Sequence, residues 1–181
     1  MRLSQEDGQL YYKLWLPLLD YVNKKYQING NQKSMAMAER LDLVVVKEVS
    51  DKIWSDLEII DCYLGEHPEF LEDERNIIRG WKRRIQGRFV MERHLKKGTI
   101  FISMEDEEVY QVSGITSSWE EMFYGAPMPL MVETTLIPFR DMIISDGLVR
   151  PYSILMGGGV KRRLKDIYMT AKESDRIHRT L

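Results

Sequence analysis

The hydrophobic period of the chain changes once, near residue 87, and this change constrains the fold more than any other feature. Before it, apolar residues recur at spacings of three and four, which is typical of amphipathic helices. After it, short runs rich in β-branched and aromatic residues alternate with turn residues, which is typical of strands. We therefore expect an α+β protein with a helical part, residues 1–87, and a sheet-bearing part, residues 88–181.

Four helices are predicted in the first part, each from an apolar stripe with start or stop residues around it. They cover residues 4–28, 35–54, a segment that begins after Trp54 and ends at Gly65, and about 72–86. Pro17 lacks a backbone N–H, so we expect a kink or two shorter helices within the first of these segments. Ser55 and Glu58 form a capping-box pattern for the third helix, and Gly87 is the predicted stop of the fourth.

Six short strands are predicted in the second part. They lie at about 89–91, 99–102, 109–112, 131–137, 142–144 and 152–156. The first three are joined by connections too short for a crossover, so they are expected to pair antiparallel. Ser118 and Glu121 predict a short capped helix, and Asp146-Gly147 predicts a turn.

A last helix is expected from Val160 to Lys172. The second part is thus a bent antiparallel sheet or a small β-barrel, closed by a C-terminal helix. No flexible spacer separates the two parts, so we expect them to form one compact unit.

The length and the cysteine content bound the class of protein. With 181 residues, of which 44% are hydrophobic, the chain is long enough to bury a substantial core. A lone cysteine, Cys62, excludes a disulfide framework and favours a reducing compartment. Because Cys62 lies among apolar neighbours, it is expected to be a small buried hydrophobe rather than a nucleophile.

No segment predicts a membrane partner. The most apolar early stretch, residues 10–19, contains Lys13 and is too short to cross a bilayer. It also lacks the basic leader and the cleavage site of a signal peptide. A cytoplasmic protein is therefore expected.

The net charge of −2 conceals four blocks of alternating sign. Residues 1–78 and 98–159 carry formal net charges of −6 and −7, whereas residues 79–97 and 160–181 carry +7 and +4. The near-neutral total therefore argues only against a uniformly basic surface. It leaves open two local basic regions.

The two basic blocks supply the candidate binding residues. Those of the first block are Arg79, Lys82, Arg83, Arg84 and Arg88. The second block is Lys161, Arg162, Arg163 and Lys165, and its candidate binding residues are Lys161 and Arg162. Arg79, Lys82 and Arg83 are expected on one face of a helix. Clustered cations neutralise phosphates and release counterions, so nucleic acid or a ribonucleoprotein is the expected partner. Alternatively these faces are solvated and complement the acidic blocks, an interpretation that an isoelectric point near 6.0 favours.

Gly157, Gly158 and Gly159 directly precede the second basic block. Successive backbone N–H groups before a helix can hold an anion, to which Lys161 or Arg162 would add charge-assisted bonds. Against this interpretation, the phosphate-binding pattern G-x-x-x-x-G-K-[ST] is absent and the preceding strand lies in an antiparallel context. The glycines alternatively let the chain turn sharply from sheet to helix. No cofactor is predicted.

Residue patterns that would indicate catalysis are sparse. The three histidines, His67, His94 and His178, are scattered, and one cysteine cannot anchor a zinc cluster, so no metal site is predicted. Glu92 and His94 share one strand face and form a candidate acid–base pair, with an ordinary surface pair as the alternative. No nucleophile–base motif is present. We assign no catalytic residue and favour binding over catalysis.

Seven short strings of the chain resemble a family of bacterial proteins that is common in anaerobic Firmicutes and has no assigned activity. They are Tyr12-Lys13-Leu14-Trp15, Gly80-Trp81-Lys82-Arg83, Phe89-Val90-Met91-Glu92-Arg93, Val109-Tyr110-Gln111-Val112, Leu136-Ile137-Pro138-Phe139-Arg140, Ser145-Asp146-Gly147-Leu148 and Gly157-Gly158-Gly159-Val160-Lys161-Arg162. The strings are spread over most of the chain. Some members of that family carry a metal-binding C-terminal tail, but this sequence has no cysteine-rich tail, so the resemblance implies no zinc site. It implies a bacterial cytoplasmic protein and no catalytic residues.

The sequence is compatible with three functions. The leading interpretation is a non-catalytic binding protein that engages nucleic acid or a ribonucleoprotein through the basic blocks. The second is an enzyme that acts on a phosphorylated or anionic small molecule at Gly157–Gly159. The third is a structural homodimer in which blocks of opposite charge meet across a two-fold axis. One continuous basic patch would favour nucleic acid, and two patches beside acidic surface would favour the structural role.

Overall fold

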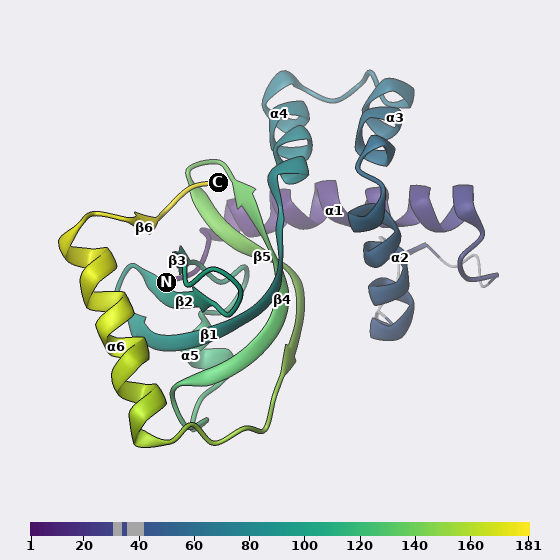
Figure 1. Ribbon diagram of the computed structural model, residues 1–181. Coiled ribbons are helices and arrows are strands. Elements are labelled where there is room, and N and C mark those ends of the chain that lie inside the picture. Colours follow the sequence, from purple (N-terminus) through teal and green to yellow (C-terminus); the bar gives the residue numbers. More distant parts are fainter. Residues whose placement is uncertain (31–33, 36–41) are drawn as a thin grey trace. The chain divides into compact units, whose positions relative to one another are not determined.

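A computed structural model describes residues 1–30, 34–35 and 42–181 of the chain (Figure 1). The chain is α+β, as predicted, with helices before a sheet and one helix after it. The described residues form two compact units. The helical unit comprises residues 6–82, and the sheet unit comprises residues 1–5 and 83–181. None of the helices formed by the described residues is long and apolar enough to cross a membrane.

The described residues of the helical unit form four α-helices. They are α1 (Gln5–Tyr26), α2 (Leu43–Ser55), α3 (Glu58–Glu66) and α4 (Glu72–Gly80). α1 continues through Pro17 as one helix, so a division into two helices is wrong. Leu14 and Leu18 are both fully buried, and burial of the stripe on either side of Pro17 outweighs the lost backbone hydrogen bond.

The boundaries of α2 and α3 differ from the prediction. Residues 36–41, which the prediction placed in the second helix, lie outside the described residues. α2 begins behind Asp42, whose side chain accepts a hydrogen bond from the backbone N–H of Val44 at 3.0 Å. The capping box predicted at Ser55 is wrong, because Ser55 is the last residue of α2 and its hydroxyl donates to the carbonyl of Lys52 at 2.9 Å. α3 instead begins at Glu58 without a side-chain cap.

α4 ends at Gly80 rather than near residue 86, and the next residue, Trp81, is fully buried. A 3₁₀ turn (Trp81–Arg83) follows α4, and the first strand begins at Ile85. Gly87 is therefore not a helix stop, and it pairs with Thr134 in the sheet. The Trp81 ring lies 5.3 Å from Trp15 and 6.2 Å from Tyr11, measured between ring centroids.

Aromatic rings form the core of the helical unit. Trp15 stacks on Trp54 at 5.4 Å and meets Trp81 edge to face, and all three side chains are at most 2% exposed. On α3, Tyr63 and Leu64 are buried as predicted, whereas Cys62 is exposed. The prediction of a buried cysteine is wrong, because one residue along a helix turns a side chain by about 100°.

The sheet unit contains six strands and two helices. The strands are β1 (Ile85–Leu95), β2 (Gly98–Ser103), β3 (Val109–Val112), β4 (Leu130–Phe139), β5 (Met142–Pro151) and β6 (Ile177–His178), and the helices are α5 (Trp119–Met122) and α6 (Gly158–Glu173). The strand order is β2-β1-β4-β5-β3-β6, with β2 also paired to β3. The sheet is mixed rather than antiparallel, because β3 pairs parallel with β5 and with β6.

The additional pairing makes the sheet curl back on itself, so that it has an inner and an outer face (Figure 1). Phe89 and Met91 of β1 belong to the cluster on one face, with Trp119 of α5. Val90, between them, belongs to the cluster on the other face, which α6 covers with Leu164 and with Tyr168 and Ala171. Alternation along one strand thus supplies both cores.

Two local predictions in β5 and after it are wrong. Asp146-Gly147 does not end a strand but forms a bulge within β5, since Leu136 faces Ser145 while Thr134 faces Val149. Gly147 has φ 87°, which is the backbone freedom that the turn signal indicated. Residues 152–156 form no strand, and Leu155 is 87% exposed.

The capping box at Ser118 is confirmed. The Ser118 hydroxyl accepts from the backbone N–H of Glu121 at 3.2 Å, and the Glu121 carboxylate accepts from the backbone N–H of Ser118 at 2.7 Å. These two bonds satisfy N–H groups that the short helix α5 leaves open.

The N-terminal residues pack on the sheet unit. The backbone N–H of Leu3 donates to the carbonyl of Gly114 at 2.9 Å, and the N–H of Gly114 donates to the carbonyl of Met1 at 3.1 Å. A Cβ on Gly114 would lie 1.9 Å from the carbonyl oxygen of Ser117, so this close approach requires glycine. The sheet unit is therefore assembled from two segments that are separated by the helical unit in the sequence.

Candidate nucleic-acid interface

α6 presents the second basic block to solvent. Its inner side is buried against the sheet through Leu164, Tyr168 and Ala171. Besides Arg163, its exposed cations are Lys161, Arg162, Lys165 and Lys172. Lys161, Lys165 and Lys172 recur at spacings of four and seven residues and therefore lie along one side of the helix, and Arg162, next to Lys161, lies about 100° further round. Among the described residues, none of these four side chains forms an ion pair.

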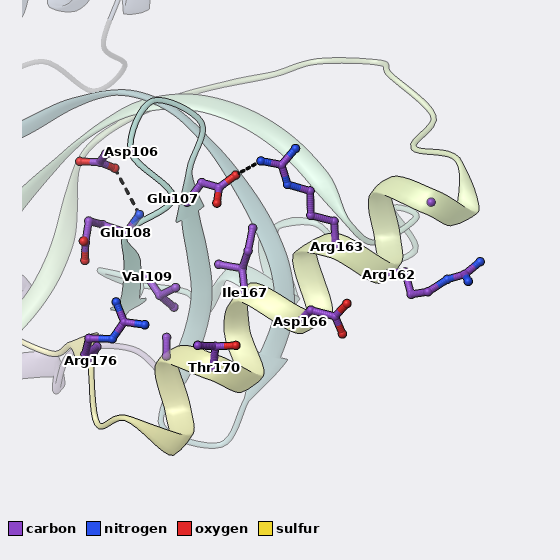
Figure 2. Close-up of a pocket in the computed structure, with 12 residues that line it drawn as sticks. Asp106, Glu107, Glu108, Val109, Arg162, Arg163, Asp166, Ile167, Thr170 and Arg176 are labelled. Carbon is purple, nitrogen blue, oxygen red and sulfur yellow. Dashed lines mark hydrogen bonds and ion pairs between the residues drawn. The ribbon is translucent and has the colours of Figure 1, made fainter.

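A groove of about 740 Å³ lies between α6 and the β2–β3 loop (Figure 2). The loop wall is acidic, whereas the α6 wall carries both Arg162 and Arg163 and the acidic Asp166. The basic side chains are Arg162, Arg163 and Arg176, and the acidic ones are Asp106, Glu107, Glu108 and Asp166. Arg163 points across the groove and forms an ion pair with Glu107, whereas Arg162 points away from the loop (Figure 2).

The β2–β3 loop is held in place by a network of hydrogen bonds. The Ser103 hydroxyl accepts from the backbone N–H groups of Glu105 and Asp106 at 3.3 and 3.4 Å, and the Asp106 carboxylate accepts from the N–H of Glu108 at 3.2 Å. Hydrogen bonding to Ser103 lowers the pKa of Asp106. Glu107, at the tip, has φ 60°, an uncommon conformation for a residue with a side chain. The β2–β3 loop therefore has a defined backbone conformation.

Glu108 ties the base of this loop to the segment after α6. Its carboxylate lies 2.8 Å from Nε2 of His178, and the His178 ring stacks on Tyr110 with centroids 5.1 Å apart. Two acidic residues of one loop thus each meet a basic residue from the C-terminal segment, Arg163 in one case and His178 in the other.

The first basic block is divided between the two units. Arg79 and Lys82 belong to the helical unit, where Arg79 donates to the Asn76 side chain at 3.1 Å and Lys82 forms an ion pair with Asp61. Arg83 is exposed and begins the second segment of the sheet unit. The predicted helical face of Arg79, Lys82 and Arg83 is wrong, because the helix ends at Gly80 and the last two lie in the 3₁₀ turn.

Arg84 and Arg88 lie beside the start of β1. Arg88 is exposed and stands opposite Glu133 in the β1–β4 register. It lines a second groove, of about 680 Å³, together with Tyr152. The Tyr152 hydroxyl donates a hydrogen bond to the Glu133 carboxylate, and this hydrogen bond raises the pKa of Tyr152. No sequence pattern indicated this tyrosine–carboxylate pair, whose members lie 19 residues apart.

Within the sheet unit, the cations of the first block do not converge with those of α6 (Figure 1). Within the sheet unit, the start of β1 and the start of α6 lie at different ends (Figure 1). The cations at the start of β1 therefore do not extend the exposed basic side of α6. Each block also borders acidic groups: Asp61 at Lys82, Glu133 opposite Arg88, and Glu107 at Arg163. Separate blocks beside acidic groups are the arrangement expected for the structural role, so only the α6 cations that are unpaired among the described residues support a nucleic-acid contact.

The three glycines form the start of α6 rather than a sharp turn. Gly157 precedes the helix with φ −68° and ψ 164°, and Gly158 and Gly159 lie within it. A Cβ added at any of the three would meet no atom within 4 Å. All three are exposed, and only Gly159 of the three lines the groove. The glycines thus offer open space rather than an enclosed cradle for an anion.

The candidate acid–base pair of β1 does not form. Glu92 binds Arg93 instead, with one N–O distance of 2.8 Å, and Arg93 stacks over the Tyr168 ring at 4.3 Å. These contacts link β1 to α6. His94 instead meets the Thr99 hydroxyl through Nδ1 at 2.8 Å, and burial lowers its pKa.

No group of three or more His, Cys, Asp or Glu side chains among the described residues is placed to hold a metal ion. No family model, curated protein or solved structure matches the chain.

Proposed function

We propose that this chain is a non-catalytic binding protein that engages nucleic acid, free or within a ribonucleoprotein, through the exposed side of α6. The observation that carries the proposal is the set of four exposed cations on α6, none of which forms an ion pair among the described residues. Exposed cations of this kind bind phosphates by releasing condensed counterions.

The dimensions of α6 fit this role. Lys161 and Lys172 are eleven residues apart, which corresponds to about 16 Å along a helix. Phosphates of one strand follow each other at about 3.4 Å along the duplex axis, so this side of α6 spans about five base pairs. Lysine and arginine contacts to phosphate position a protein without reading bases, so we expect binding that depends weakly on sequence.

The glycines support this proposal less than the cations do. An enzyme that held an anionic small molecule at Gly157–Gly159 would need an enclosed site, and these residues lie in open space. We therefore assign anion binding to the side chains of α6 rather than to the glycine backbone.

Charge reversal with a matched control tests the proposal. The α6 variant is K161E/R162E, and the control is R79E/R83E, which changes the net charge equally at two exposed residues of the first block. Binding of a labelled duplex is followed by fluorescence anisotropy. Wild type with four phosphate contacts should lose about 100-fold in affinity between about 50 and 200 mM salt. The α6 variant should bind more weakly and lose about half of the salt slope, whereas the control should keep the slope.

The outcomes separate the three functions considered for this chain. No binding at low salt, or binding that salt leaves unchanged, contradicts the proposal. If both variants lose duplex affinity and salt slope equally, the phosphate contact is not made by α6. A homodimer held by opposite charges would dissociate at high salt, so light scattering of each variant at both salt concentrations shows whether the reversal acts on assembly instead.

A further inference from the structure

We infer that the β2–β3 loop is a built-in competitor for the nucleic acid proposed above: Glu107 occupies Arg163 and so limits both the affinity of α6 and its dependence on salt. The inference rests on the proposed function. Its basis is that Arg163 belongs to the same basic block as Lys161, Arg162 and Lys165, yet is the one cation of these four that is paired among the described residues.

The Arg163–Glu107 ion pair is exposed to solvent, so a phosphate can reach Arg163 and compete with the carboxylate. The Arg163 side chain is 73% exposed and that of Glu107 is 47% exposed. Exposed pairs of this kind contribute little to stability, and an incoming phosphate could replace the carboxylate without desolvating a buried charge. The carboxylate therefore stands where a phosphate oxygen would be expected to bind.

Hydrogen bonds within the β2–β3 loop fix the position of Glu107. Ser103 and Asp106 hold its backbone by hydrogen bonds, and Glu107 adopts φ 60° at the tip. His178 holds the neighbouring Glu108. Because the loop is ordered by these bonds, the carboxylate stays near Arg163 at little further cost in chain entropy. A competitor that is held in place acts at high effective concentration.

Neutralising the competitor tests the inference. E107Q frees Arg163, whereas E105Q makes the same charge change in the same loop at a residue that lines the second groove instead. Relative to E105Q, E107Q should bind the labelled duplex about threefold tighter, since an exposed pair competes with only modest strength. Its plot of log affinity against log salt should steepen by about 0.9, the slope of one added phosphate contact.

A double-mutant comparison assigns the effect to Arg163. R163Q alone should change binding little, because Glu107 already occupies that residue, whereas E107Q/R163Q should lose the gain of E107Q. Equal affinities and slopes for E107Q and E105Q overturn the inference while leaving the proposed function intact. A gain that persists without Arg163 also overturns it. Absence of binding in every variant overturns the proposed function, and this inference with it.

Discussion

The two basic blocks have similar compositions but different surroundings. The first is divided between the two units, and Lys82 is neutralised by Asp61 while Arg88 faces Glu133. The second lies on a single helix and leaves four exposed cations without an ion pair among the described residues. A run of cations in a sequence therefore indicates a binding face only when one element presents it and when its partners in the fold leave it unpaired.

The largest expected effect is a loss of unfolding free energy when Trp81, which lies within the first block, is truncated. Trp81, between Arg79 and Lys82, is fully buried, and W81A should lower the free energy of unfolding by about 3–5 kcal/mol. The Trp81 indole N–H forms no hydrogen bond among the described residues. W81F should therefore recover much of the loss. Denaturant unfolding measures both, and a W81F as unstable as W81A would contradict this account.

A second substitution separates packing from binding in the second block. Leu164 lies on the side of α6 that is buried against the sheet. L164A should therefore cost about 2–4 kcal/mol of unfolding free energy. Its neighbour Lys165 is exposed, so K165A should stay within about 0.5 kcal/mol of wild type while weakening duplex binding. If K165A destabilises the protein as much as L164A, this side of α6 is not a free surface.

The ion pair of the first block should matter much less. The side chains of Lys82 and Asp61 are 34% and 53% exposed, so K82A or D61A should cost at most about 1 kcal/mol. K82A should also leave the salt slope of duplex binding unchanged. A slope reduced by K82A would show that the first block contacts phosphate after all, and the contrast between the blocks would then disappear.

The smallest effect expected is a pH dependence in the acidic loop. The Ser103 hydrogen bond lowers the pKa of Asp106 below its ordinary value of 3.8. The stabilisation is therefore complete above pH 3.8 and is lost as the pH falls through the lowered pKa. S103A should raise the pKa of Asp106, which an NMR titration of its carboxyl carbon would detect. An unchanged pKa in S103A would assign the shift to another group.

Local patterns predicted much of the fold, but the surroundings decided how each pattern was used. Ser118 and Ser55 both stand three residues before a glutamate, yet only Ser118 caps a helix. Ser55 ends the preceding helix, where the carbonyl of Lys52 takes its hydroxyl. Asp146-Gly147 likewise supplied the backbone freedom of a turn, but pairing with β4 on both sides made it a bulge. Such choices depend on contacts between distant residues, which periodicity does not contain.

The candidate site was predictable in part for the same reason. The charge blocks identified the cations of α6, because those residues are consecutive in the sequence. They did not identify the partner of Arg163, since Glu107 lies 56 residues away. Nor did they show that the first block spans two units, because that depends on where Trp81 packs.

The packing of residues 1–5 on the sheet unit makes the helical unit an insertion. The chain leaves the sheet unit after residue 5 and returns at residue 83. The hydrogen bonds of Met1 and Leu3 to Gly114 therefore close a loop that contains every helix from α1 to α4. Closing a long disordered loop costs more entropy than closing one whose ends are already held by folded structure. We therefore expect the helical unit, whose helices are built from local contacts, to fold early. Its completion would then let the first five residues of the chain be the last to dock.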